Sequence, residues 1–248
     1  MIHMVGGCIP DPVDTDDIPI RGFLDTSTPI PVKLSYQTLV PEMKDQGKIP
    51  VCVSMGCTTI KETIDNKNGE YGKLSALWLY DQCKRRDGDP YGEGTFIRTA
   101  MKVMAKQGLM PNYVAPFDGA YSFGKYNEYI FDEELAHPYK IKTYARLTDV
   151  EDMCRCLSQH GPFAMGVQTT DEFDDVDIDG YIPIHYRKVG GGHCIAVVGY
   201  DLEELVFFIV NSWGPGWGNN GCAKMPFEYW NRFGMDAWGI VDISPNEI

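Results

Sequence analysis

The segment Asn211-Ser212-Trp213-Gly214-Pro215-Gly216-Trp217-Gly218-Asn219-Asn220-Gly221 is the most distinctive stretch of this 248-residue chain. The apolar run at 206–210 leads directly into it and predicts a buried strand, because β-branched and aromatic residues favour strands. Asn211 alone could cap a turn. The adjacent Ser212 and Trp213 favour a different role, in which the Asn211 amide orients a neighbouring functional group.

Upstream, Gly190, Gly191 and Gly192 precede His193, and an apolar strand is predicted from Cys194 to Tyr200. Glycines without a Cβ let the backbone come close to a ligand. Taken alone, His193 would be an ordinary histidine. With Asn211 at the end of the next predicted strand, we interpret it as a general base.

The third segment is Asp45-Gln46-Gly47-Lys48-Ile49-Pro50-Val51-Cys52, and its cysteine supplies a nucleophile. A free thiol has a pKa of about 8.5, and a nearby imidazolium or helix N-terminus lowers it. His193 would take the thiol proton and later give it to a leaving amine. Asn211 would orient the imidazole. Gln46 would donate N–H groups to the oxyanion, and the Cys52 backbone N–H would be the second donor.

These three segments resemble the papain family of cysteine peptidases, in its short-leader prokaryotic or viral form. His193 follows Cys52 by about 140 residues, close to the spacing of about 130–150 typical of that family. The cysteine segment departs from the pattern, because Ile49-Pro50-Val51-Cys52-Val53 stands where the family has Cys-Gly-Ser-Cys-Trp. By this resemblance the missing Cys removes one disulfide partner, and the missing Trp affects part of the primed-side wall of the cleft but not the nucleophile. The likeness runs from about residue 30 to 229.

The resemblance implies an α+β fold of two lobes, helical first and β-rich second, with the active-site cleft between them. The peptidase domain would cover 30–248, with the helical lobe at about 30–138 and the β-rich lobe at about 139–248. A substrate backbone would pair with the chain near Gly94 and Thr95. Phe96 and Ile97 would shape the pocket for the second residue before the cut. Gly192 and Trp213 would complete the substrate-binding residues, and Trp213 would shield the Asn211–His193 hydrogen bond from water.

Local patterns predict the elements that carry these residues. Apolar residues recur at helical spacing from Cys52 to about Asp65. Further helices are predicted at 74–86, where Ser75 is the expected cap, and at 98–107 and 150–160. Strands are predicted at 139–144, 163–168, 194–200 and 206–210. Helices in the first half and strands in the second indicate an α+β fold.

Residues 1–29 are rich in Asp and Pro and predict an extended segment. Its apolar residues, among them Ile9 and Ile20, could anchor it, so we expect it to cover or border the cleft and restrain activity. Packing on the back of a lobe is the alternative. The acidic run at 171–179 lacks the central turn glycine of a calcium loop, and we expect a solvated loop.

Composition limits the partners. The net charge of −13 argues against nucleic acid and against an anionic membrane surface. No cofactor or metal is expected, since Cys154, Cys156, His193 and Cys194 lack zinc-site spacing. Eight cysteines in a chain of this size, without an export signal at the N-terminus, favour reduced thiols and a cytoplasmic or other intracellular location.

The predicted activity is hydrolysis of peptide bonds in a peptide or protein substrate. An amidase, aminopeptidase or peptide ligase could use the same constellation, because all share an acyl-enzyme. A catalytically inactive binding homologue is a rival of another class. The sequence leaves the natural substrate, endo- against exopeptidase action and the oligomeric state undetermined.

Overall fold

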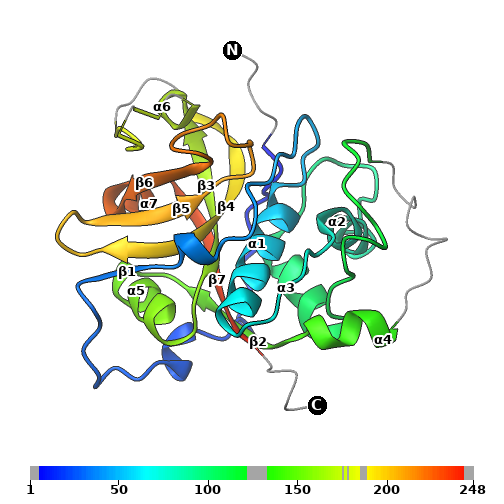
Figure 1. Cartoon of the computed structure of the whole chain (residues 1–248), viewed down its shortest axis with the longest axis horizontal. Coiled ribbons are helices and arrows are strands. Elements are labelled where there is room, and N and C mark those ends of the chain that lie inside the picture. The colour runs from blue at the N-terminus through cyan, green and yellow to red at the C-terminus, as the bar shows by residue number, and fades with distance from the viewer. Residues whose placement is uncertain (1–5, 122–132, 175, 178, 185–188, 243–248) are drawn as a thin grey trace.

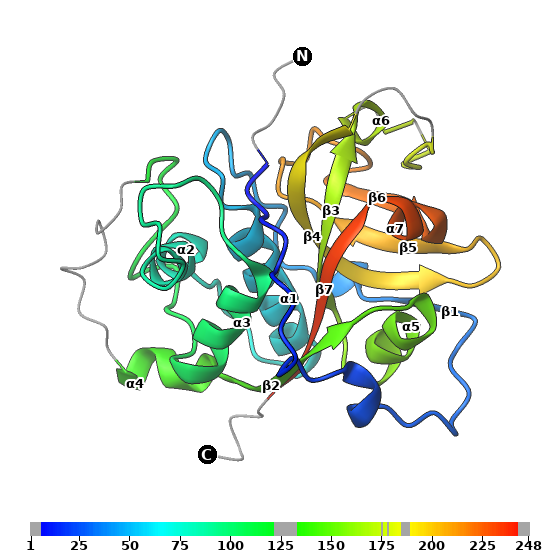
Figure 2. The same cartoon turned by 180° about the vertical axis from the view of Figure 1, so that it is seen from behind.

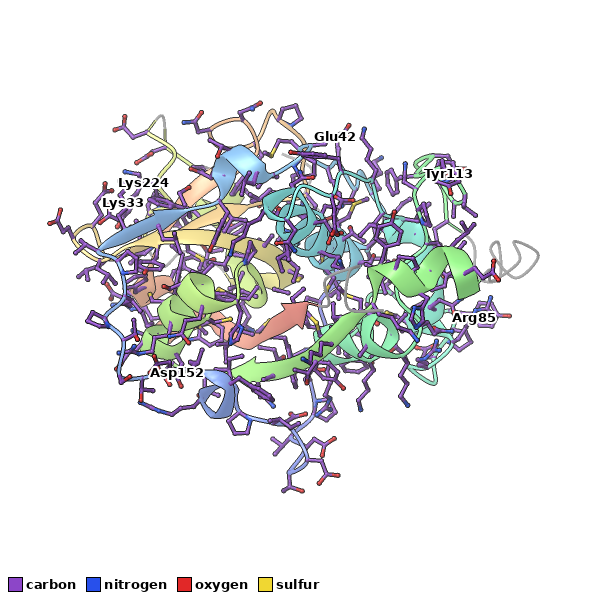
Figure 3. The ribbon with its side chains drawn as sticks, turned by 60° about the horizontal axis from the view of Figure 1, so that its bottom comes forward. Lys33, Glu42, Arg85, Tyr113, Asp152 and Lys224 are labelled. Atoms are coloured by element: carbon purple, nitrogen blue, oxygen red, sulfur yellow. The ribbon has the colours of Figure 1, made fainter. Side chains whose placement is uncertain are left out.

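A computed structural model describes residues 6–121, 133–174, 176–177, 179–184 and 189–242, and it has helices on one side and a sheet on the other (Figure 1). The helical side holds α1 (Cys52–Lys67), α2 (Ala76–Lys84), α3 (Ile97–Lys106), α4 (Glu133–Ala136) and the 3-10 turn η3 (His137–Tyr139). In Figure 3 the labelled Arg85 and Tyr113 lie on the helical side, and Lys33 and Lys224 lie on the sheet side.

The sheet side is an antiparallel sheet in the order β2-β7-β3-β4-β5-β6, with β1 paired to β4. Its strands are β1 (Lys33–Ser35), β2 (Ile141–Leu147), β3 (Phe163–Thr170), β4 (Val189–Asp201), β5 (Val206–Val210), β6 (Cys222–Pro226) and β7 (Gly234–Asp242). Between them lie α5 (Val150–Gln159), α6 (Asp171–Asp174) and α7 (Phe227–Phe233), and the 3-10 turns η1 (Ile20–Phe23) and η2 (Gln37–Leu39) precede α1.

The sheet separates two hydrophobic cores because side chains of a strand alternate between its faces. Cys194, Ala196 and Val198 of β4 join the core around α1, α2 and α3. Ile195 and Val197 join the other core, which also contains buried residues of α5 and α7. At the boundary, a Cβ on Gly56 of α1 would lie 3.1 Å from Cys194 Sγ, so helix and sheet approach closely. Both cores therefore fix β4, the strand that carries His193.

The described N-terminal segment, residues 6–29 and hereafter the leader, runs between the two sides and then under the sheet (Figure 2). Its Ile18 carbonyl accepts a hydrogen bond from Arg146 N of β2 at 2.8 Å. Ile20 is 1% exposed and belongs to the core around α5. Near Asp152, labelled in Figure 3, Arg21 of η1 lies 3.9 Å from that carboxylate. The second half of the leader is thus part of the folded body.

The α+β prediction is confirmed, and three local predictions need correction. The helix predicted at 74–86 begins at Ala76 and ends at Lys84, although Ser75 is its cap and accepts a hydrogen bond from Trp78 N. Residues 33–35, assigned to the helical lobe, form β1 and join the sheet at β4. The acidic run is not wholly a solvated loop, because its first four residues form α6, with Phe173 buried.

Cysteine pairing, membrane-spanning helices and metal sites complete the description of the fold. All eight cysteines are free thiols. Within the described ranges, none of the helices combines the length and apolar character needed to cross a membrane. In the same part of the chain, His, Cys, Asp and Glu side chains form no group of three that could hold a metal ion.

Candidate active site

Cys52 is the first residue of α1 and is completely buried. The N-terminal residues of a helix have backbone N–H groups without partners inside the helix, and the helix dipole favours negative charge there. No side chain caps this end, because the preceding Val51 makes no side-chain hydrogen bond to it. The helix start is therefore available to stabilise charge that develops on the Cys52 sulfur or beside it.

His193 and Asn211 meet because β4 and β5 are neighbours in the sheet. His193 Nε2 lies 2.7 Å from Asn211 Oδ1. The same Oδ1 accepts a hydrogen bond from Ser212 N at 2.7 Å, so it acts as an acceptor and Nε2 carries the proton. Among the described residues His193 Nδ1 has no hydrogen-bond partner, and it remains as the proton acceptor.

Two aromatic side chains pack against the imidazole, and a third supports them. The Trp213 ring centroid lies 4.7 Å from that of His193, and Phe173 lies 5.9 Å away in an edge contact. Trp217 Nε1 donates to Phe173 O at 2.9 Å, which ties α6 to the segment after β5. Burial lowers the pKa of His193 to about 4, and the hydrogen bond that the imidazole donates to Asn211 opposes this shift only in part. The imidazole is therefore neutral in this state.

Gln46 is 1% exposed and belongs to the same site. Its Oε1 accepts a hydrogen bond from Ser212 Oγ at 2.6 Å, and its Nε2 donates to Ile49 O at 2.9 Å. Gln46 N also donates to Ser212 O at 2.8 Å. Ser212 thus fixes which end of the Gln46 amide is the donor, and one Nε2 hydrogen remains for a further acceptor.

The leader crosses this site at Gly7, Cys8 and Ile9. Thr95 N donates to Gly7 O at 3.0 Å, and Ile9 N donates to Thr95 O at 3.0 Å. On the other side Cys8 N donates to Gly192 O at 3.1 Å. The leader is therefore a short strand held between a loop of the helical side and the start of β4.

Small residues permit this fit. A Cβ on Gly192 would lie 2.1 Å from Cys8 O, and one on Gly94, whose φ is +77°, would lie 2.7 Å from Gly7 O. The Cys8 Sγ and the Ile97 side chain converge where Gly166 lacks a side chain, at 2.9 and 3.3 Å from its would-be Cβ. Both sides of the site are thus shaped to a backbone that lies extended along it.

The predicted site residues fall into two groups. Gln46, His193, Asn211 and Trp213 are joined by hydrogen bonds or ring contacts around Ser212. Gly94, Thr95, Ile97 and Gly192 border the leader, whereas Phe96 is the half-buried residue before α3. Cys52 adjoins both groups, since the backbone N–H groups of Cys194 and Gly7 act on its sulfur.

The Cys52 thiol differs from the sequence-based expectation of a low pKa. Burial raises its pKa to about 11, and the N–H groups of Cys194 and Gly7 offset only part of that effect. The physical reason is burial, because Cys52 is completely buried and the loss of water disfavours the thiolate. With the leader in place, thiol and imidazole are both neutral.

A buried ion pair behind Thr95 was not predicted from the sequence. Lys84 Nζ donates to Gly94 O at 2.9 Å and lies 3.6 Å from Asp87, and both side chains are 2% exposed. Asp87 in turn accepts a hydrogen bond from Thr95 Oγ1 at 2.6 Å, and Tyr80 accepts one from Gly94 N at 3.0 Å. These contacts hold the loop that pairs with the leader.

Phe173 and Ser212 are further residues that sequence reasoning missed as parts of the site. Ser212 adjoins Asn211, so its position was a usable signal. The position of Phe173 in the sequence gave no such signal, because it is an apolar residue among the acidic side chains of 171–179.

Comparison with known proteins supplies the family. The model of the papain family cysteine proteases matches residues 31–238, which is most of the chain. The chain belongs to the papain family of cysteine proteases. Among its relatives is an uncharacterized peptidase C1-like protein of Acanthamoeba polyphaga mimivirus, 28% identical over 218 residues, covering 81% of this chain and 70% of the relative. Papain of Carica papaya is 24% identical over 223 residues, covering 85% and 59%.

The family's solved structures agree with the fold. Xylellain, a cysteine protease from Xylella fastidiosa, superposes with a TM-score of 0.81 at 26% identity and covers 96% of each chain. Procathepsin L2 from the Tenebrio molitor midgut, at 21% identity and a TM-score of 0.78, shares the fold. The prediction of a papain-like peptidase of the prokaryotic and viral kind is confirmed. The chain spans about two thirds of the length of the curated relatives described here.

Proposed function

We propose that this papain-family protease cuts peptide bonds with Cys52 as nucleophile, His193 as general base and acid, and Asn211 as the residue that orients the imidazole. The observation that carries the proposal is the hydrogen bond of 2.7 Å between His193 Nε2 and Asn211 Oδ1, which leaves Nδ1 as the proton acceptor. An imidazole held in one tautomer in this way can take a proton at a fixed position.

The reaction follows from these positions. His193 Nδ1 takes the thiol proton as the Cys52 sulfur attacks the substrate carbonyl carbon, and the carbonyl electrons move to oxygen. Gln46 Nε2 and the Cys52 backbone N–H donate to that oxyanion. Collapse breaks the C–N bond, and His193 gives its proton to the leaving amine. Water, deprotonated by His193, then attacks the thioester and releases the acid and the thiol.

Replacement of the nucleophile tests this assignment. Cys52→Ala should abolish cleavage of a peptide library and covalent labelling by an epoxysuccinyl reagent, while the circular dichroism spectrum stays unchanged. Cys57→Ala is the matched control, because Cys57 is a completely buried thiol on the same helix. Labelling of another cysteine in preference to Cys52 would contradict the assignment.

The products formed from the same peptide library distinguish an endopeptidase from an aminopeptidase, an amidase, a ligase and an inactive homologue. Cleavage within peptides favours an endopeptidase, and removal of single N-terminal residues favours an aminopeptidase. Release of ammonia from amides or transfer to an added amine would identify an amidase or a ligase. An inactive homologue would label slowly and cleave nothing even after the leader is displaced.

The leader restrains this activity in our proposal. The Gly7 N–H lowers the pKa of Cys52, and the Gly7 carbonyl accepts a hydrogen bond from Thr95 N, so we infer that the segment lies beside the nucleophile without offering that carbonyl for attack. A Cβ on Gly7 would lie 2.3 Å from Pro50 O, so Gly7→Ala should displace the leader and speed labelling of Cys52. Gly22→Ala is the matched control, because a Cβ there meets nothing within 4 Å. Equal labelling rates in the two variants would refute the restraint.

Specificity is proposed from the same contacts. The Cys8 side chain lies beside Ile97 and Gly166, and a substrate side chain would enter that place once the leader has left. Ile97 is completely buried and apolar, which favours an apolar residue two positions before the cut. A library showing strong preference for a charged residue at that position would contradict this proposal.

A further inference from the structure

The leader is anchored beyond the cleft by a buried carboxyl group. Asp11 is 7% exposed, and its backbone N–H donates to Asp236 Oδ2 of β7 at 2.7 Å. Its own Oδ2 accepts hydrogen bonds from Trp238 Nε1 at 2.8 Å and from Arg98 N at 3.2 Å. Asp11 therefore connects the leader to β7 on the sheet side and to the start of α3 on the helical side.

The second oxygen of this carboxyl is poorly satisfied. Asp11 Oδ1 is buried and accepts no hydrogen bond from the described residues, and Arg98 Nε lies 3.9 Å away from it. A buried carboxylate needs several donors or a close cation to remain charged. Asp11 has two donors on one oxygen only, so its neutral form fits this site better.

The surrounding charges also favour the neutral form of Asp11. Arg98 contacts Asp17 at 2.9 Å, and Arg146 contacts both Asp17 and Asp236, at 2.9 and 2.7 Å. Both guanidinium groups are thus already engaged with other carboxylates, and negative charge is in excess. The titratable groups around Asp11 are Asp14 and Asp17 of the leader, Arg98 of α3, Arg146 and Tyr144 of β2, Asp236 of β7, and the thiols of Cys8, Cys57 and Cys194.

We propose that the buried carboxyl pair Asp11 and Asp236 is a proton-dependent latch, which holds the leader in the cleft in mildly acidic solution and loosens it as the pH rises. The consequence for activity rests on the proposed restraint by the leader. The latch itself concerns only whether the leader is docked.

Proton linkage determines whether docking of the leader becomes stronger or weaker as the pH rises. Burial, and next to it the charge of Asp236, raises the pKa of docked Asp11 to about 6, and burial also raises that of Asp236. In a released leader Asp11 would return to the ordinary pKa of about 3.9. Protons then bind the docked form more tightly, so docking gains strength below pH 6 and loses it as the pH rises through 6. Docking should be about tenfold more favourable at pH 5 than at pH 7.5.

The test measures how well the fold protects the thiol of Cys8, a leader residue that is 5% exposed when the leader is docked. The full chain carrying Cys52→Ala is labelled with methyl methanethiosulfonate, and the Cys8 peptide is quantified by mass spectrometry. Dividing by the rate of the urea-denatured chain at the same pH removes the reactivity of the thiol itself. Because Cys52 is absent, the result does not depend on catalysis, and failure of the proposed function would leave it unchanged.

The expected result is protection of Cys8 about tenfold higher at pH 5 than at pH 7.5. Asp11→Asn should remove this dependence, and Asp16→Asn, which removes an exposed leader carboxylate, should keep it. Cys156, completely buried in the core around α5, reports global unfolding. Protection of Cys8 that is independent of pH, an unchanged dependence in Asp11→Asn, or a parallel change at Cys156 would each overturn the latch.

Discussion

Lys84→Met removes the buried cation behind the loop that lines the cleft. The lysine loses its hydrogen bond to Gly94 O, at 2.9 Å, and Asp87 loses a cation 3.6 Å away while remaining 2% exposed. Removing one partner of a buried pair destabilises a protein by about 3–5 kcal/mol, chiefly because the other charge stays buried. We therefore expect the free energy of unfolding to fall by that amount at neutral pH, measured by urea denaturation.

The pH and a second substitution identify the cause. Burial already raises the pKa of Asp87, and loss of Lys84 raises it further, so at low pH Asp87 is protonated and the loss should shrink. Asp87→Asn in the Lys84→Met background should recover about 1–3 kcal/mol, because no charge is then left buried. Lys102→Met on the exposed face of α3 should change stability by less than about 0.5 kcal/mol. A loss below about 1 kcal/mol, or no recovery in the double variant, would refute the reasoning.

Three further predictions concern the catalytic site. Gln46→Ala should lower kcat by about 10²–10³ with little change in KM, measured by steady-state kinetics on a peptide, and a rise in KM at constant kcat would assign Gln46 to binding instead. Asn211→Ala should lower kcat less than His193→Ala does, since it only orients the imidazole, and equal losses would contradict that role. Phe173→Ala should destabilise the fold by about 3–5 kcal/mol and admit water to His193, raising the imidazole pKa in NMR titration towards its ordinary value of about 6.5.

Much of the architecture was predictable because local and global signals agree. Apolar residues recur at helical spacing along α1, and the asparagine and histidine segments each follow or precede a strand with a strong apolar run. The expected contact between His193 and Asn211 then needs only that β4 and β5 be neighbours, which a short connection between them favours.

Other features depend on contacts that no local pattern encodes. The role of Phe173 arises from packing against Trp213 and Trp217, and in the sequence the acidic neighbours of Phe173 outweigh it. β7 contains glycine and aspartate and resembles a turn more than a strand, yet it pairs with β2 and β3. The raised pKa of Cys52 could not be foreseen either, because it depends on how completely the folded chain buries the sulfur.

The attachment of the leader decides how a shortened chain should be interpreted. A chain beginning near Thr28 would lose the cleft strand, but also Ile20 from the core and Asp17, which bridges Arg98 of α3 and Arg146 of β2. Low activity of that chain would then reflect lost folding. Single substitutions such as Gly7→Ala separate the loss of the restraint on activity from the loss of folding.

Because the leader is fixed to the core at Ile20, its residues 7–9 can leave the cleft without leaving the protein. Their local concentration near Cys52 is set by about a dozen intervening residues and not by the amount of protein in solution, and short tethers of this kind give effective concentrations of about millimolar order. The proposed restraint therefore predicts that dilution does not activate the enzyme. Under this proposal a substrate present well below that concentration competes with a segment that rebinds after each departure, and the apparent KM depends on the tether as well as on the cleft.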